Sequence, residues 1–185
     1  MIRRDNNIFR RIISVLFLVF LVSGVQASEW TPEFSGVRIT YANNIWHKVT
    51  ERSSPGDSMI VIMDKRDGSV IMLRQESGDE IANISAKSIE VYLYDLLKKK
   101  SPGTTITGKS LAKIGNYNFR TIFYRYINPR YGNQILQHAY LKKGKSIVTL
   151  TCAWPVKLVI KKGNKLPEKI SSIVNTIDLG ENSKE

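Results

Sequence analysis

The chain has 185 residues, 28 of them basic and 16 acidic, and carries a formal net charge of +12 at pH 7. That length suits a single domain large enough to bury a core without covalent cross-links. Its only cysteine, Cys152, excludes an intramolecular disulfide and the disulfide framework of small secreted domains.

The first residues follow the three-part pattern of a secretory signal peptide. Four arginines precede an apolar stretch from 12 to 25, and Val25-Gln26-Ala27 then places small residues where a signal peptidase reads the chain. The apolar stretch is shorter than the roughly 20 residues of a spanning helix and contains two serines and a glycine. We therefore expect a signal peptide at 1–27 and an exported domain at 28–185, periplasmic or extracellular. The alternative is an uncleaved signal that anchors the chain in the inner membrane.

Strand patterns follow. Apolar residues alternate with polar ones from 37 to 41, and an Asn-Asn pair separates them from the strand-like segment 45–50, which predicts a hairpin. Segments 59–64 and 69–75 flank Arg66-Asp67-Gly68 and predict a second hairpin. The run MIVIM at 59–63 is nearly all apolar, which predicts a central strand buried on both faces.

The periodicity changes at Ser85, where a helix is predicted to begin and to extend to the lysine triplet 98–100. Ser85 can cap its first turn, the lysines suit its C-terminal end, and Pro102-Gly103 prevents continuation. The apolar residues at helical spacing are Ile89, Tyr92, Leu93, Leu96 and Leu97.

Four strand-like runs come next, at 104–114, 118–127, 134–142 and 146–154. Their short connections require antiparallel neighbours, so this half is predicted to be a meander. A last helix is predicted near Pro167, with apolar residues at i, i+3, i+4 and i+7: Ile170, Ile173, Val174 and Ile177.

The order of elements is thus four strands, a helix, four strands and a helix. Because strands and helices do not alternate, a doubly wound parallel sheet is disfavoured. The pattern predicts an α+β fold, a mainly antiparallel sheet flanked by helices. Its core is expected within 34–179, followed by a frayed polar tail.

The chemical inventory predicts no enzyme. His47 and His138 lie far apart, and alternation around Cys152 turns its side chain into the core, so a zinc site is not expected. Asp79-Glu80 is typical of a solvated loop, and the sequence contains no nucleophile elbow, Walker loop or dinucleotide-binding glycine motif. We expect no catalytic residues, metal or cofactor; a site assembled from dispersed residues is the alternative.

Two sets of residues are candidates for a binding surface. The first is a basic-aromatic stripe on one face of two predicted strands: Arg120, Tyr124, Tyr126, His138 and Tyr140. Exposed, such a stripe suits nucleic acid, sugar rings or a protein hot spot. Packing beneath a helix, together with Ile122 and Leu136, is the interpretation we favour. The second is a lysine patch: Lys142, Lys143, Lys145, Lys161 and Lys162.

Positive charge outside the cytoplasm points to anionic lipid headgroups, acidic polysaccharide or an acidic protein before nucleic acid. Plain solubility is the alternative explanation for scattered lysines. If the patch binds an anionic surface, salt must weaken that binding steeply.

With the elements in order, the segment 34–179 resembles the PsbP-like fold, in particular the DcrB-type proteins of the bacterial envelope. The matching segments are VRITYANNIW, MIVIM with SVIML, SIEVYLYDLLKKK, IGNYNFRTIFYRY, SIVTLTCAWP and PEKISSIVNTI. The resemblance implies an antiparallel sheet flanked by helices, used as a non-enzymatic accessory or binding module. The same fold serves as a photosystem II extrinsic subunit and as a nuclear import factor that binds a small GTPase.

No functional residue carries over from the resemblance, because a shared fold does not transfer a ligand. DcrB-type proteins usually carry a lipid-anchoring cysteine near the cleavage site, and this sequence has none there. We expect an envelope accessory protein that engages a protein partner or an anionic lipid or polysaccharide surface, without nucleic acid. A secreted enzyme acting on an acidic polymer is the alternative.

Overall fold

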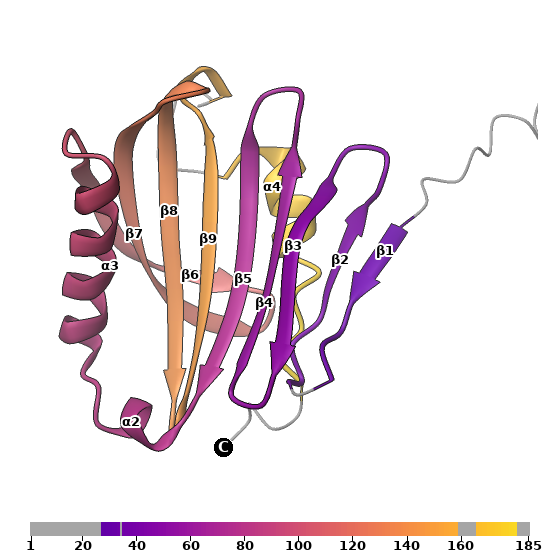
Figure 1. Ribbon diagram of the computed structural model, residues 1–185, viewed down its shortest axis with the longest axis vertical. Helices are drawn as coiled ribbons and strands as arrows, with labels where there is room; N and C mark the ends of the chain where they lie inside the picture. Colours follow the sequence, from indigo (N-terminus) through magenta and orange to yellow (C-terminus); the bar gives the residue numbers. More distant parts are fainter. Residues whose placement is uncertain (1–26, 34, 159–165, 181–185) are drawn as a thin grey trace, which may run out of the picture.

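The computed structural model describes residues 27–33, 35–158 and 166–180. Within these ranges, seven strands form one antiparallel sheet and two strands form a small sheet beside it (Figure 1). The large sheet consists of β3 (His47–Ser54), β4 (Asp57–Asp64), β5 (Ser69–Ser77), β6 (Thr105–Ile114), β7 (Tyr117–Asn128), β8 (Gly132–Lys143) and β9 (Ser146–Pro155). The remaining elements are β1 (Ala27–Trp30), β2 (Ile39–Ala42), α2 (Asp79–Ala82), α3 (Ala86–Lys100), the 3-10 turn η1 (Val156–Leu158) and α4 (Glu168–Val174).

The strand order in the large sheet is β3-β4-β5-β9-β8-β7-β6. The last four strands form the predicted meander, and the β4–β5 hairpin also forms as predicted. Pairing of β5 with β9 joins the two halves of the chain into one sheet. The fold is therefore the expected α+β arrangement with a mainly antiparallel sheet.

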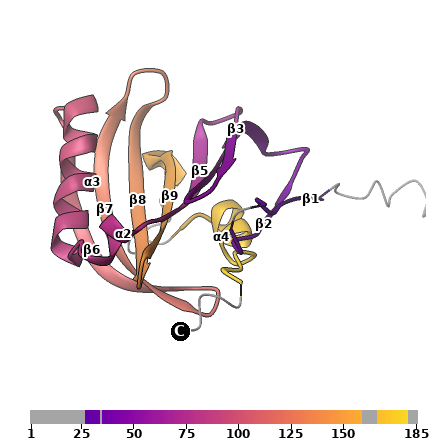
Figure 2. The ribbon, with the colours of Figure 1, turned by 60° about the horizontal axis from the view of Figure 1, so that its bottom comes forward.

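Helices lie on opposite faces of this sheet (Figure 2). α3 begins where predicted, because the Ser85 hydroxyl accepts a hydrogen bond from the Ser88 N–H at 3.1 Å. On the other face, α4 buries Ile170, Ile173 and Val174. These side chains belong to the main core cluster, which also contains Trp30, a residue that precedes the expected core. The main core thus lies between α4, the small sheet and the large sheet.

The first predicted hairpin is wrong. β2 pairs with β1 in the small sheet, whereas β3 pairs with β4 in the large one. The N–H groups of Ile45 and Trp46 both donate to the carbonyl of Ala42, which curls the chain into a turn that separates the two strands. The buried indole of Trp46 keeps this turn packed against the core.

The prediction that 59–63 is buried on both faces is also wrong. Ile60 and Ile62 are fully buried in the main core, but Met59, Val61 and Met63 are only half-buried. The strand therefore has one covered and one partly open face. The reason is that α3 packs mainly over β7 and β8 and does not cover this part of the face.

None of the helices among the described residues is long and apolar enough to cross a membrane. The predicted signal segment lies outside the described residues except for Ala27, the first residue of β1. The predicted polar tail at 181–185 also lies outside them.

Candidate functional site

The face of the large sheet that carries α3 is only half covered. Ile89 and Leu93 of α3 pack with Tyr140 of β8 in one small cluster. Farther along the helix, Leu97 and Tyr94 pack against a second cluster built mainly from β7 and β8. The helix therefore covers the β7–β8 side of this face and leaves the β4–β5 side to solvent (Figure 1).

The uncovered part can be traced strand by strand from the pairing register. Residues directly opposite each other on antiparallel neighbours lie on the same face. His138 of β8 pairs with Thr151 of β9, which pairs with Met72 of β5, which pairs with Val61 of β4. The two flanking rows are traced in the same way: Met63, Val70 and Ala153 form one, and Met59, Arg74 and Thr149 form the other. We call the resulting surface the open face; it consists of Met59, Val61, Met63, Val70, Met72 and Arg74, and the buried Thr149 and Thr151 of β9 border it on the side of α3.

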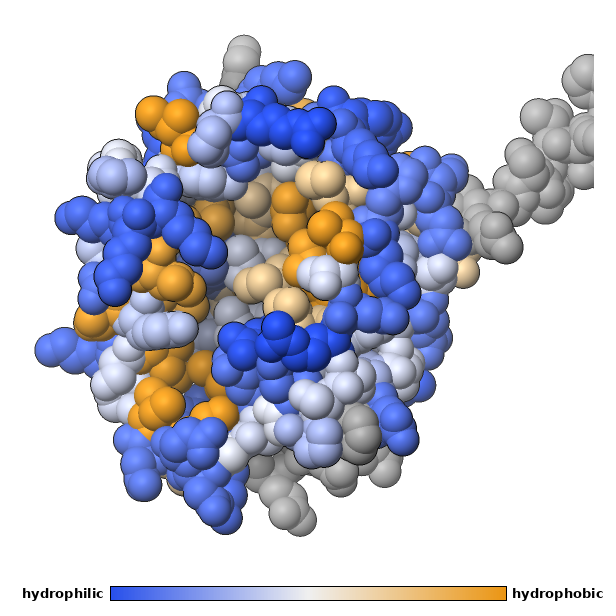
Figure 3. Space-filling model, viewed as in Figure 1, coloured by the Kyte–Doolittle hydropathy of each residue, from blue (hydrophilic) through white to orange (hydrophobic). Residues whose placement is uncertain are grey.

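The open face is the floor of a groove. Figure 3 shows this side of the molecule hollowed between α3 and the β4–β5 hairpin, with apolar residues gathered in the hollow and hydrophilic ones on its rim. Toward α2 the groove deepens into a cavity of about 500 Å³, lined among others by Asp57, Glu76, Ile81, Tyr92 and Thr149. That volume lies within the range of ligand-binding clefts.

The helical wall of the groove carries unusually exposed apolar side chains. Tyr92 and Leu96 lie one turn apart on α3 and are 63% and 42% exposed. Ile84, at the α2 end, is also exposed and lines the cavity. Together with the open face they form a mainly apolar surface, which Arg74 interrupts near the cavity, and exposed apolar surfaces of this kind mark interaction sites.

The carboxylates of the cavity are engaged in ion pairs. Asp57 accepts hydrogen bonds from Arg74 at 2.9 Å and from Arg52 at 2.7 Å, and Arg74 also pairs with Glu76 at 2.9 Å. The Arg74 guanidinium holds the pKa of Asp57 below its ordinary value. Because Asp57 is ionised near neutral pH, it cannot donate a proton there.

The predicted basic-aromatic stripe is packed beneath α3. Tyr124, His138 and Tyr140 are buried, so their assignment to an exposed surface was wrong and the packing interpretation is correct. Tyr124 stacks on Tyr94 of α3, and His138 Nδ1 hydrogen-bonds Thr151 Oγ1 at 2.7 Å. Burial lowers the pKa of His138 to about 4, so the ring is neutral at pH 7.

The other two members of the stripe adjoin these buried residues: Tyr126 packs against the cluster that contains Tyr124, and Arg120 pairs with Tyr140 across β7 and β8. Tyr126 is half-buried and donates its hydroxyl to Gln134, whereas Arg120 is exposed. The structure therefore does not bring the five residues together as one accessible surface.

The lysine patch is partly engaged. Lys142 donates to the carbonyl of Ala82 at 3.0 Å, and Lys145 pairs with Asp79 at 2.6 Å. Lys143 is half-buried at the same turn. Lys161 and Lys162 lie outside the described residues. An anionic-surface patch therefore stays a prediction.

Cys152 points into the core as predicted and is fully buried. Burial raises the pKa of its thiol well above the ordinary value, which keeps the unreactive protonated form. In the described part of the chain, no group of three His, Cys, Asp or Glu side chains is arranged to hold a metal ion.

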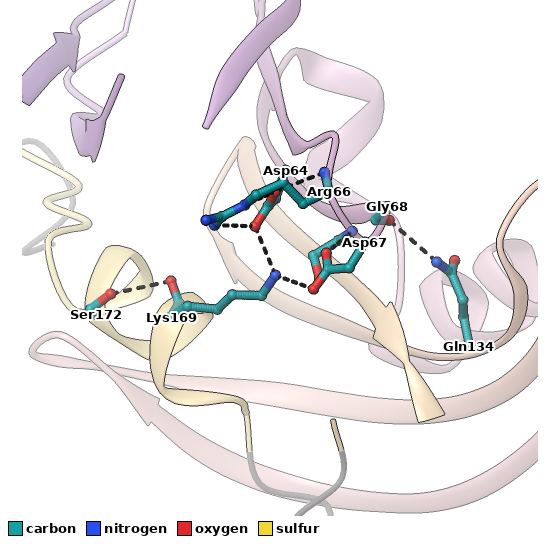
Figure 4. A network of polar contacts seen from close by, with 8 residues as sticks. Asp64, Arg66, Asp67, Gly68, Gln134, Lys169 and Ser172 are labelled. Carbon is teal, nitrogen blue, oxygen red and sulfur yellow. Dashed lines mark hydrogen bonds and ion pairs between the residues drawn. The ribbon is translucent and has the colours of Figure 1, made fainter. Parts of the chain in front are cut away.

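A second polar cluster, which sequence reasoning missed, joins α4 to the β4–β5 turn (Figure 4). Lys169 Nζ lies 3.0 Å from Asp64 Oδ2 and 2.5 Å from Asp67 Oδ2, and 5.7 Å from the centre of the Trp46 ring. Arg66 contacts Asp64 through Nε at 2.9 Å and Nη2 at 2.8 Å. We call these five residues the α4 clamp.

The clamp is structural. The Asp64 side chain is only 1% exposed, and the Arg66 guanidinium together with Lys169 holds its pKa far below the ordinary range. The buried negative charge is thus compensated on two sides, which leaves no group poised for proton transfer.

No protein-family model and no curated protein matches this sequence. Solved structures do match it. The cyanobacterial PsbP (CyanoP) of Synechocystis sp. PCC 6803 aligns over 85% of this chain and 95% of that chain, with a TM-score of 0.58 and 12% identity. A Bacteroides thetaiotaomicron protein gives a TM-score of 0.51 at 11% identity, over 85% of this chain and 50% of that one.

LpqN of Mycobacterium tuberculosis, involved in cell envelope biogenesis, aligns over 84% of this chain and 92% of that chain, with a TM-score of 0.46 and 17% identity. At these identities the comparisons define the fold alone, and the CyanoP match confirms that it is PsbP-like. The DcrB-type assignment stays a prediction.

Proposed function

We propose that this chain is a non-enzymatic accessory protein of the bacterial envelope and that it engages a protein partner through the groove. The observation that carries the proposal is the open face beside Tyr92 and Leu96. Burying these exposed apolar side chains against a partner would stabilise a complex, and aromatic and methionine side chains are enriched at interfaces.

The envelope location rests on the N-terminal sequence. The arginine-rich start, the apolar stretch and the small residues before Ser28 support export by the secretory route. The PsbP-like fold is compatible with a binding module, because fold alone dictates no chemistry.

A protein partner is favoured over an anionic surface because two of the three described patch lysines, Lys142 and Lys145, already contact protein oxygens. An enzyme is disfavoured because Asp57 and Glu76, the carboxylates that line the cavity beside Arg74, are ion-paired. Release of products from an acidic polysaccharide by the purified chain would restore the enzyme alternative.

The function is tested by affinity capture from envelope extract with the tagged full-length chain. Leu96→Glu places a charge on the groove wall and should abolish capture of the specific partner. Leu111→Glu makes the same change at a 75% exposed site on the edge strand β6 and should leave capture intact. Equal capture by both variants and the wild type would refute a role for the groove.

A further inference from the structure

The strands beneath the groove limit the kind of partner segment that can bind. β4, β5 and β9 each have a hydrogen-bonded neighbour on both sides. Their backbone N–H and C=O groups are therefore already used, so an extended peptide cannot add to the sheet there. A segment that lies on this apolar floor must satisfy its own backbone hydrogen bonds, and an α-helix does so.

The shape of the groove suits a helix as well. Its wall, α3, has 15 residues and is about 22 Å long, the length of roughly four turns. Three of the four methionines in the sequence, Met59, Met63 and Met72, lie on the floor. Methionine side chains are flexible and polarisable, and they adapt to the irregular apolar face of a docked helix.

The two ends of the groove differ in charge. The last turn of α3 carries Lys98, Lys99 and Lys100. At the opposite end the cavity is lined by three carboxylates, Asp57, Glu76 and Glu80. Glu80 forms no ion pair within the described residues, whereas Arg52 and Arg74 compensate the other two. Lys142 and Lys145 also lie at this end, against Ala82 and Asp79 of α2, so the groove is strongly positive at one end and close to neutral at the other.

This polarity selects one orientation of a docked helix. Helices carry acidic residues in the first turn and basic residues in the last, in line with the helix dipole. The acidic first turn of such a helix fits beside the lysine triplet 98–100, and its basic last turn fits beside Glu80. The docked helix then runs antiparallel to α3, which also pairs the two helix dipoles favourably.

We infer that the groove binds an amphipathic α-helix of a partner protein, oriented antiparallel to α3. The inference rests on the proposed function and names the partner's binding segment. The apolar stripe of the helix lies on the open face between Tyr92 and Leu96 on one side and the β4–β5 hairpin on the other.

The floor methionines can report where the docked helix lies and which way it runs, because they mark different ends of the groove. Met63 lies beside the row of Val70 and Ala153, in the cluster that also contacts Leu97 of α3, and so marks the basic end. Met59 lies in the row of Tyr140, whose hydroxyl contacts the Ala86 carbonyl, and so marks the other end. The two residues are about 13 Å apart along β4.

The experiment uses the full chain labelled with methyl-¹³C methionine and two synthetic amphipathic peptides of about 18 residues. Both peptides have the same apolar stripe and composition; one has glutamates first and lysines last, and the other has the reverse. The first should shift all three floor methyl resonances saturably and bind at least about fivefold more tightly. A spin label at its N-terminus should broaden Met63 more than Met59.

Adjacent residues of α3 supply the matched variants. Tyr92→Glu should weaken binding of the first peptide by about tenfold or more, because it charges the groove wall. Val91→Glu changes a 51% exposed side chain next to it in sequence but on another face of the helix, and should alter the affinity by less than about twofold. Unchanged melting curves for both variants exclude unfolding as the cause.

Each other outcome overturns the inference. If the spin label broadens the Met59 methyl resonance more than that of Met63, the helix binds in the opposite orientation. If both peptides bind with equal affinity, the charges at the two ends of the groove do not select the orientation. Shifts that depend on protein concentration without peptide indicate a second copy of this chain, and tighter saturation by a free fatty acid indicates an acyl ligand. If Leu96→Glu abolishes capture of a partner but neither peptide shifts the methionine resonances, the partner segment is not a helix of this kind. The proposed function then still holds.

Discussion

Replacing Lys169 with methionine removes the positive charge by which α4 holds the β4–β5 turn. The methionine keeps most of the apolar stem that lies near Trp46 but deprives two acidic side chains of a partner, Asp64 at 3.0 Å and Asp67 at 2.5 Å. Because Asp64 is buried, we expect the loss to lower the free energy of unfolding measurably.

The size of this loss in the free energy of unfolding depends on which hydrogen bonds the two acidic side chains keep after the substitution. A hydrogen bond to a charged group contributes about 1.5–3 kcal/mol, and two such bonds are lost. Asp64 retains Arg66, and Asp67 retains the N–H of Ser69, so neither charge is orphaned. We therefore expect a loss of about 2–4 kcal/mol, which lowers the melting temperature of a domain of this size by roughly 5–15 °C.

Calorimetry of the wild type and variant at pH 7 measures this difference. Lys48→Met is the matched control, because Lys48 pairs with Glu51 at 2.8 Å with both side chains half-exposed. Such pairs contribute little, so this variant should melt within about 2 °C of the wild type. If Lys169→Met also melted within that margin, the clamp would be irrelevant to stability and the reasoning refuted.

Acid should remove the same contribution. The pKa of Asp64 is lower in the folded chain than in the unfolded chain, so its stabilising effect is complete above the ordinary carboxyl pKa of about 3.9. It is lost as the pH falls below that value toward the folded pKa. The difference in melting temperature between wild type and Lys169→Met should therefore stay constant from pH 7 to about pH 4 and narrow as the pH falls further.

Three further outcomes are expected. Ile173→Asp should cost about 3 kcal/mol or more and yield unfolded or insoluble protein, because it places a charge in the core, whereas Ser171→Asp should change stability by less than about 1 kcal/mol in chemical denaturation. Mass spectrometry of the exported protein should find Ser28 at the N-terminus, and recovery of the Met1 form from membranes would restore the anchor. Cys152 should resist a thiol reagent at pH 8 until denaturant is added, and rapid labelling of the folded chain would contradict its burial.

Much of the fold was predictable because its signals are local. The start of α3 depends on Ser85 and residues three positions on, and the meander depends on turns such as Gly115 and Gly144, both with positive φ. The small sheet was not predictable in this way. Its strand β1 follows directly on a segment with signal-peptide character, and the turn at Ile45 and Trp46 breaks a pattern that otherwise favours a hairpin.

The candidate site was only partly predictable. Met59 and Met63 share one phase of the period-2 pattern of β4, so the sequence already placed these two on one face of their strand, and the β4–β5 pairing register adds Met72. It did not indicate that this face is open, because an apolar run looks the same whether a helix covers it or not. The sequence pattern of Tyr124, His138 and Tyr140 is compatible with an exposed face, but in the structure α3 covers that face and the three side chains are buried.

The sequence by itself determined the order and type of most elements, the inward orientation of Cys152 and the antiparallel pairing of the second half. These features depend on side chains only two to four positions apart. The covalent chain keeps such side chains close together in any fold, so their pattern can be read from the sequence. Only the tertiary structure decided that α3 leaves the β4–β5 side of its face uncovered, that β5 joins β9, and that Lys169 meets Asp64, 105 positions away. Such contacts depend on how whole elements pack, and periodicity along the chain carries no information about which distant face a helix will cover.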